Sequence, residues 1–168
     1  MKLLSIGHGH RKTERLIETE RPRLVQYALY RLGNRNDAED AVQDTFVRVY
    51  QRMAGGDFEE RNLVGYLYRT LSNLCVSRFR ELERLQMVPL DGEPDPENPE
   101  TEDLKQEFRR IRKLLDGIPN EQAEVIRLRY YGDKSFREIA DILGVPLTTV
   151  KSRFVYGLEK IRRKYKEI

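Results

Sequence analysis

The sequence predicts an all-α protein made of two small helical domains joined by an acidic, proline-rich linker. Apolar residues recur every three or four positions along most of the 168-residue chain, which is the spacing of a buried helix face. No segment shows the apolar–polar alternation of a half-buried strand. Residues 91–103 hold three prolines and seven acidic side chains but no basic one, so they bury too little apolar surface to fold. We therefore place a linker at 89–103, a first domain at 13–88 and a second domain at 104–168.

The composition excludes several classes of protein. A single cysteine, Cys75, excludes an intramolecular disulfide and a zinc cluster and fits a reducing cytoplasm. Its apolar neighbours favour a place in the core over a role as a nucleophile. No run of 18 apolar residues is present that would insert into a membrane, and no glycine-rich phosphate loop is present. We expect no catalytic site, no metal and no cofactor.

The first domain follows a segment, residues 1–12, that we expect to be a mobile terminus. Two histidines lie there, but two ligands in a glycine-rich end make a weak metal site. A short helix is predicted over 13–20. A second helix is predicted to start at Pro22, because proline fits the first turn of a helix, and to end at the Gly-Asn pair at 33–34.

The next predicted helix, 37–53, is capped by Asp37 and has two unlike faces. Its apolar residues fall on one side, which we expect to be buried. The opposite side carries acids and amides around a valine: Asp40, Gln43, Asp44, Val47 and Gln51. An apolar residue among carboxylates on a face that should meet water predicts a protein partner with basic side chains. A solvated acidic face is the alternative.

A loop at 54–62 leads into a long helix, 63–84, that has a polar stripe opposite its apolar face. The stripe combines an aromatic ring, an amide and two guanidinium groups, from Tyr66, Arg69, Asn73 and Arg80. Such side chains bind single-stranded DNA, because bases stack on aromatic rings and phosphates pair with arginine. Here too, a solvated helix face is the alternative.

The second domain carries most of the basic excess of the chain. Residues 104–168 hold 16 basic and 9 acidic side chains, a net charge of +7, whereas the whole chain has a net charge of +3. Helices are predicted over 104–115 and, capped by Asn120, over 120–131. A basic excess in one domain is what binding to DNA requires.

Residues 135–163 have the spacing of a helix-turn-helix. A first helix containing the small Ala140 is followed by Gly144, which suits a left-handed turn. Pro146 then suits the start of a second helix, and Val150 is placed to fill the core between the two helices. The alternative is an ordinary α-hairpin with a solvated charged face.

The side of this second helix that lies opposite its apolar stripe suits the major groove of DNA. It offers hydroxyl donors and a methyl-bearing residue, and basic side chains flank it. The candidate DNA-binding residues are Thr148, Thr149, Lys151, Ser152, Arg153, Val155, Tyr156, Arg162 and Arg163.

With these pieces in place, the chain resembles the extracytoplasmic-function sigma factors of bacterial RNA polymerase. The resemblance runs from Thr13 to Tyr165. Its first-domain segments are YALYRLGNRNDAEDAVQDTFVRVY and GYLYRTLSNLCVSRFR, and its second-domain segment is GIPNEQAEVIRLRYYGDKSFREIADILGVPLTTVKSRFVYGLEKIR. Two motif sets in the family's order, with an acidic linker between them, are more specific than the helix-turn-helix alone.

The resemblance implies a function for each surface. The acidic helix face would dock on the clamp helices of the largest subunit of core RNA polymerase. The residues implicated there are Asp37, Asp40, Gln43, Asp44 and Val47. The stripe on 63–84 would hold an unstacked base of the minus-10 promoter element, and the second domain would read the duplex minus-35 element. The protein would direct promoter recognition and DNA melting without being an enzyme itself, and an anti-sigma factor is an expected partner.

The rival prediction is a free-standing helix-turn-helix regulator that binds operators as a dimer. We find no sensor or dimerisation domain in this sequence. That class of protein also leaves the acidic face around Val47 unexplained. We therefore expect a sigma factor.

Overall fold

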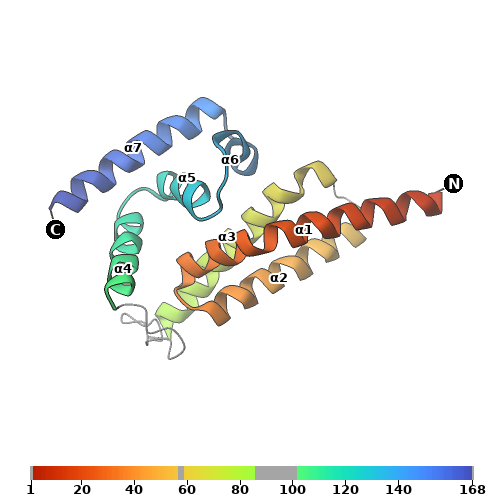
Figure 1. The fold of residues 1–168 in the computed structure, drawn as a ribbon, viewed down its shortest axis with the longest axis horizontal. Coiled ribbons are helices and arrows are strands. Elements are labelled where there is room, and N and C mark those ends of the chain that lie inside the picture. The colour runs from red at the N-terminus through yellow and green to blue at the C-terminus, as the bar shows by residue number, and fades with distance from the viewer. Residues whose placement is uncertain (1, 57–58, 86–101, 168) are drawn as a thin grey trace.

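The computed structural model describes residues 2–56, 59–85 and 102–167, and it bears out the all-α prediction (Figure 1). These residues contain no strand. All but the last two residues of the predicted linker lie outside the described ranges. The elements are α1 (Lys2–Leu32), α2 (Arg35–Ala54), the 3₁₀ turn η1 (Glu60–Asn62), α3 (Leu63–Arg84), α4 (Glu102–Asp116), α5 (Asn120–Tyr130), α6 (Phe136–Leu143) and α7 (Leu147–Lys166).

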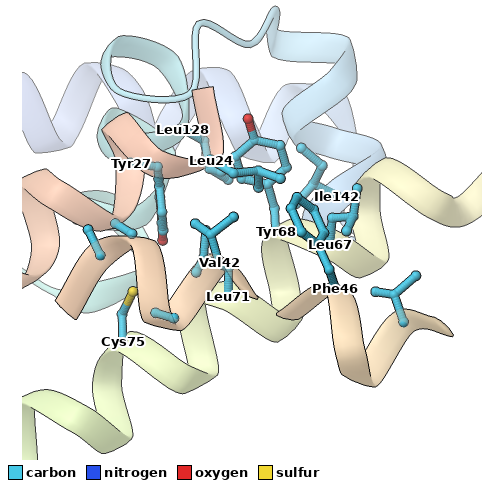
Figure 2. Close-up of a cluster of buried hydrophobic side chains, with 14 of the residues drawn as sticks. Leu24, Tyr27, Val42, Phe46, Leu67, Tyr68, Leu71, Cys75, Leu128 and Ile142 are labelled. Atoms are coloured by element: carbon cyan, nitrogen blue, oxygen red, sulfur yellow. The ribbon is translucent and has the colours of Figure 1, made fainter. Parts of the chain in front are cut away.

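The N-terminal domain is a bundle of α1, α2 and α3 around one core. Leu24, Val42, Phe46 and Leu67 are among the buried side chains that fill it (Figure 2). Cys75 lies in the same core, and burial raises the pKa of its thiol to about 12. Because the thiolate is the reactive form, this cysteine is a packing residue, as predicted. None of the described helices is both long and apolar enough to cross a lipid bilayer.

Helix α1 runs unbroken through Pro22, where the sequence analysis predicted the start of a second helix, so the two-helix prediction is wrong. The helix also includes residues 2–12, where we expected a mobile terminus. The reason is a buried face that stays in phase on both sides of the proline. That face includes Thr13, Ile17, Glu20, Leu24, Tyr27 and Ala28. Its burial outweighs the cost of about 3 kcal/mol of a proline inside a helix.

Two helix caps also differ from the predictions. Helix α2 is capped by Asn34, whose side chain accepts a hydrogen bond from the backbone N–H of Asp37 at 3.1 Å. Asp37 therefore lies in the first turn, where the negative charge of its carboxylate interacts favourably with the positive end of the helix dipole. Helix α5 follows Pro119 without a side-chain cap. The side chain of Asn120 instead accepts a hydrogen bond from Arg127 at 3.4 Å.

Helices α6 and α7 form the predicted helix-turn-helix. Gly144 has φ +66°, the left-handed conformation expected of it, and Val150 is completely buried between the helices. A capping box starts α6, which the sequence analysis missed. The Ser135 hydroxyl accepts a hydrogen bond from the N–H of Glu138 at 3.2 Å, and the Glu138 carboxylate accepts one from the N–H of Ser135 at 2.7 Å.

The two domains pack directly on each other, which the sequence did not predict. Helix α6 lies against α3, and Leu128 and Ile142 from the C-terminal domain join the core cluster of the N-terminal domain (Figure 2). The rings of Tyr30 and Tyr131 also stack across this boundary, with 4.2 Å between their centroids. The structure is therefore a closed arrangement of the two domains.

Candidate partner and nucleic-acid interfaces

Helix α7 presents its predicted DNA-reading face to solvent. Val155 and Tyr156, near the middle of the helix, are 60% and 58% exposed. Thr149 and Arg153 are half-buried at the edge of the face. The other predicted residues are exposed: Thr148, Lys151, Ser152, Arg162 and Arg163. The structure thus brings the nine predicted residues together along one helix, accessible to a duplex.

Two arginines of this face make ion pairs within the protein. Arg153 lies 3.4 Å from the carboxylate of Glu121 on α5, and Arg163 lies 3.6 Å from that of Glu159 one turn earlier. The Glu121 and Glu159 side chains are 74% and 54% exposed, so these pairs contribute little stability. Both arginines therefore remain available to phosphate groups.

Helices α5 and α7 cross closely on the buried side of α7, and this crossing fixes the position of the DNA-reading face. At Gly157, which is buried, an added Cβ would lie 2.8 Å from Cδ1 of Ile126 and 3.2 Å from Cβ of Gln122. Helices α5 and α7 therefore approach each other closely at this glycine. The sequence analysis missed Gly157, although an isolated glycine inside a strongly helical pattern is the signal for such a contact.

Helix α2 presents the predicted acidic face. Val47 is 46% exposed, which is unusual for a valine on a helix whose other apolar residues are mostly buried. Tyr50, one turn later and 40% exposed, extends the face and was missed by the sequence analysis. Asp37 is half-buried, and the exposed polar residues around the valine are Asp40, Gln43 and Asp44.

The surroundings of the acidic face differ from one residue to the next. Asp44 forms an ion pair with Arg78 of α3 at 2.5 Å, so its negative charge is partly neutralised within the protein. Asp40 instead borders a groove of about 860 Å³ between α1 and α2, whose lining includes Pro22 and Val25. A groove of mixed polar and apolar lining beside an acidic ridge is a surface that suits a protein partner.

The predicted stripe on α3 has its four residues on one side of the helix. Arg69, Asn73 and Arg80 are exposed. Tyr66 is half-buried, with the guanidinium of Arg52 4.9 Å from the centroid of its ring. The stripe therefore combines a ring already covered by one arginine with two arginines that reach solvent.

The C-terminal domain borders this stripe at both ends. Arg69 and Asn73 line a cavity of about 220 Å³ whose other wall includes Ile142 and Leu143 of α6. Arg80 lines another cavity of about 200 Å³, together with residues of α4 and α5. The α3 stripe is thus partly enclosed, unlike the open face of α7.

These features define a two-domain, helical DNA-binding protein with an acidic contact face on one domain and a basic helix-turn-helix on the other. The sigma-70 region 2 family model matches residues 16–85, and the sigma-70 region 4 model matches residues 114–163. The chain belongs to the extracytoplasmic-function sigma factors of bacterial RNA polymerase, as the sequence predicted.

Curated relatives match over most of the chain. The sigma factor SigE of Mycolicibacterium smegmatis is 30% identical over 155 residues, and the match spans 89% of this chain but 60% of that protein. SigW of Bacillus subtilis is 26% identical over 170 residues, spanning 91% of this chain and 88% of that one. The sigma-E factor of Haemophilus influenzae is 27% identical, spanning 95% and 90%.

Two solved structures share the fold. CnrH in complex with the cytosolic domain of CnrY has a TM-score of 0.65 at 24% identity, with 94% of this chain and 90% of that one covered. RpoE of Bartonella quintana in complex with the anti-sigma factor NepR has a TM-score of 0.63 at 23% identity, with 93% and 98% covered. At these identities the likeness concerns the fold alone.

Proposed function

We propose that this chain binds core RNA polymerase and directs it to promoters, where it recognises two DNA elements and helps to open the duplex. In this proposal residues 13–88 dock on polymerase and capture the minus-10 strand, and residues 104–168 read the minus-35 duplex. One observation carries the proposal. The domains that match sigma-70 regions 2 and 4 each present an exposed helix face centred on an exposed valine, and the two faces have opposite charge.

Docking uses the acidic face of α2. Its partner is a basic protein surface, which the family resemblance assigns to the clamp helices of the largest polymerase subunit. The exposed Val47 and Tyr50 supply apolar contact area, and Asp40 and Asp44 supply charge complementarity. In this division of roles, the apolar residues supply most of the affinity and the surrounding aspartates supply the selectivity for a basic partner.

Melting uses the stripe on α3. Taking a base out of the stack costs a few kcal/mol, so a protein that opens DNA without ATP must offset that cost by binding. Tyr66 offers a ring for a base, Asn73 offers an amide for its edge, and Arg69 and Arg80 offer guanidinium groups for phosphates. In this proposal the chain contributes binding energy and polymerase performs the chemistry, so the chain itself is not an enzyme.

The chain acts in the cytoplasm, where polymerase and promoter DNA are found, and an anti-sigma factor is a further partner. The support for that partner is that RpoE of Bartonella quintana was solved with the anti-sigma factor NepR and CnrH with the cytosolic domain of CnrY. Both share this fold. An anti-sigma factor acting here would have to cover the α2 face, the α7 face or both.

In vitro transcription tests the proposal. Purified core polymerase and genomic fragments should yield transcripts with discrete start sites only when this chain is added. The rival, a free-standing dimeric regulator, receives no support from the relatives. It predicts instead that the chain elutes separately from core polymerase in size-exclusion chromatography and binds its DNA site without polymerase. Separate elution together with an absence of promoter-directed transcripts would overturn our proposal.

A further inference from the structure

Four arginines from four different helices surround one cavity between the domains. The cavity has a volume of about 200 Å³, and its lining includes Arg31 of α1, Arg80 of α3, Arg112 of α4 and Arg127 of α5. Of the other described residues that line it, Asp116 alone carries a charge. The arginines are far apart in the chain, so the fold gathers them and no local run of basic residues does.

The cavity differs from the neighbouring contacts between the domains, which pack closely and balance their charges. At Gly65 on α3, an added Cβ would lie 3.5 Å from Cα of Ile142 on α6, which is ordinary contact distance. Lys134, between α5 and α6, has a side chain only 1% exposed, and its Nζ lies 2.8 Å from both carboxylate oxygens of Glu20 on α1. The cavity instead leaves space between α3, α4 and α5 and has an excess of positive charge.

Two of the arginines are buried, and carboxylates hold them in place. The side chain of Arg31 is 11% exposed, and its Nη1 lies 3.0 Å from Oε2 of Glu124 on α5. The side chain of Arg127 is 7% exposed, and its Nη atoms lie 3.5 Å from Glu124 and 3.3 Å from Asp116. These contacts are made by Nη atoms, whereas a guanidinium group carries five N–H donors in all. Both groups are therefore fixed beside the cavity and can also donate to a ligand.

The other two arginines are more accessible. Arg80 is exposed on α3, and Arg112 is half-buried on α4. The guanidinium of Arg112 lies 4.5 Å from the centroid of the Phe79 ring, a cation–π contact that helps to hold it at the cavity. Even when Glu124 is counted with Asp116, the four positive charges exceed the two negative ones by two. Like charges that are gathered in a partly buried site repel one another, so an anion bound there would be stabilised.

The rest of the lining suits a small oxyanion. The rings of Tyr30 and Tyr131 stack beside the cavity. Burial raises the pKa of Tyr131 to about 12, so its hydroxyl stays protonated and can donate a hydrogen bond. The arginine fork matches the oxygens of a phosphate group, to which it can donate two parallel hydrogen bonds. Because sites for drug-sized ligands measure about 300–1,000 Å³, this smaller cavity suits a phosphate group better than a whole nucleotide.

We propose that this cavity binds a phosphate group that carries two negative charges, either as inorganic phosphate or as the terminal phosphate of a nucleotide. Two negative charges would offset the excess of positive charge around the cavity. The site is distinct from the faces proposed to bind polymerase and promoter DNA, with which it shares Arg80 alone. A bound phosphate would contact helices of both domains and so stabilise the folded chain.

Isothermal titration of the full-length chain with sodium phosphate, at constant ionic strength, tests the site. We expect saturable binding with a Kd of about 1 mM or tighter. Adenosine 5′-diphosphate is the second probe, and it distinguishes the two sources of the phosphate group. Equal affinity for both probes would support a site for the phosphate group alone, and tighter binding of the nucleotide would support a site for its terminal phosphate. If neither probe shows saturable binding up to about 10 mM, the proposal is wrong.

A pair of matched substitutions tests whether the arginines of the cavity are responsible. Arg112→Gln removes one guanidinium and should weaken phosphate binding at least tenfold, because charge-assisted hydrogen bonds to phosphate are strong. Arg48→Gln makes the same change at an exposed position of α2, outside the cavity, and should bind phosphate like the wild type. Equal affinities of the two variants for phosphate would overturn the proposal, since binding would then not depend on the cavity.

Val76→Glu gives an independent arm. Val76 is half-buried and lines the cavity, so a glutamate there would place a carboxylate among the arginines in the position proposed for phosphate. Phosphate should therefore raise the Tm of the wild type and of Arg48→Gln, but not that of Val76→Glu or Arg112→Gln. Each variant is compared with and without phosphate, so a change in its own stability does not alter the comparison. If phosphate raises the Tm of Val76→Glu as much as that of the wild type, phosphate binds elsewhere and the cavity is not its site.

Discussion

The exposed faces of α2 and α7 are built alike and charged oppositely. Each is the solvent side of a 20-residue helix with an exposed valine near its middle, Val47 on α2 and Val155 on α7. The first face also carries Asp40 and Asp44, whereas the second carries or is flanked by Lys151, Arg162 and Arg163. In the proposed function, each valine lies at the centre of a contact surface. In the proposed function, the charge on each face then selects the partner: a basic protein for α2 and a phosphate backbone for α7.

The largest expected effect comes from reversing one charge on α2. Asp40→Arg should weaken binding to core polymerase by more than about 100-fold, because a like charge placed against a basic partner costs several kcal/mol. Asp40 is a cleaner choice than Asp44, since Asp44→Arg would also place two guanidinium groups together by removing the pair with Arg78. Fluorescence anisotropy at moderate salt measures the affinity.

The control for this prediction is Glu14→Arg, the same change of charge at an exposed position of α1. It should leave polymerase affinity near the wild-type value. If both variants bind polymerase equally well, the acidic face of α2 is a solvated surface. The proposal that α2 and α7 are two contact faces for oppositely charged partners would then be wrong.

The next effect distinguishes two kinds of residue on α7. Ser152→Ala with Tyr156→Ala should cost about 1–3 kcal/mol for each base that is no longer read and relax the preferred sequence at those positions. Lys151→Ala with Arg162→Ala should instead weaken all sequences alike and reduce the salt dependence by about one unit for each phosphate group that is no longer bound. Selection from a randomised minus-35 library, with the full chain in its polymerase complex, separates the two outcomes.

The full chain is needed because part of the core of the C-terminal domain is shared with the N-terminal one. If both pairs of substitutions lower affinity without altering the selected sequence, α7 holds DNA but does not read it. The faces of α2 and α7 would then both bind their partners through complementary charge, and they would differ only in the sign of that charge.

Both faces could be predicted from the sequence because each depends on local periodicity. Val150 and Gly144 took their predicted places for the same reason, since the spacing of a helix-turn-helix is set within 30 residues. Helix α1 shows where such reasoning fails. Pro22 is a strong local signal, but a buried face contributed by the rest of the fold overrode it.

The contact between the two domains could not be predicted from the sequence, for a different reason. Glu20 and Lys134 are 114 positions apart, and nothing local distinguishes either of them from a solvated charge. Gly65 gives no signal either, because it is one small residue at the start of a long helix. Contacts of this kind depend on how the surfaces of two folded domains fit together. The periodicity of apolar residues along the chain contains no information about that fit.

A smaller effect tests the two valines directly. Val47→Ser should weaken polymerase binding by about 1 kcal/mol and leave DNA affinity unchanged, because it replaces apolar contact area with a hydroxyl at one face only. Val155→Ser should do the reverse, weakening promoter binding by a similar amount and sparing polymerase. Isothermal titration against core polymerase, and promoter binding by the assembled complex, measure both. If either substitution weakens both interactions, the valines support the fold and are not contact residues.

The smallest effect contrasts the cap of α2, the helix that carries the acidic face, with the cap of α6, the helix that precedes α7 in the helix-turn-helix. The backbone N–H of Ser135 lowers the pKa of Glu138 in the capping box of α6, whereas Asn34, which caps α2, is an amide that does not titrate. Since the folded-state pKa of Glu138 is below its unfolded value, its contribution is complete above the unfolded pKa and is lost as pH falls through the folded one. Glu138→Gln should therefore lower the free energy of unfolding at pH 7 by less than the ~1 kcal/mol typical of losing a cap, and the difference from wild type should vanish toward pH 3. Asn34→Ala should lower it by about 1 kcal/mol at both pH values. Urea unfolding curves at a series of pH values measure these differences, and a deficit for Glu138→Gln that persists unchanged at pH 3 would mean that the carboxylate of Glu138 does not hold the start of α6.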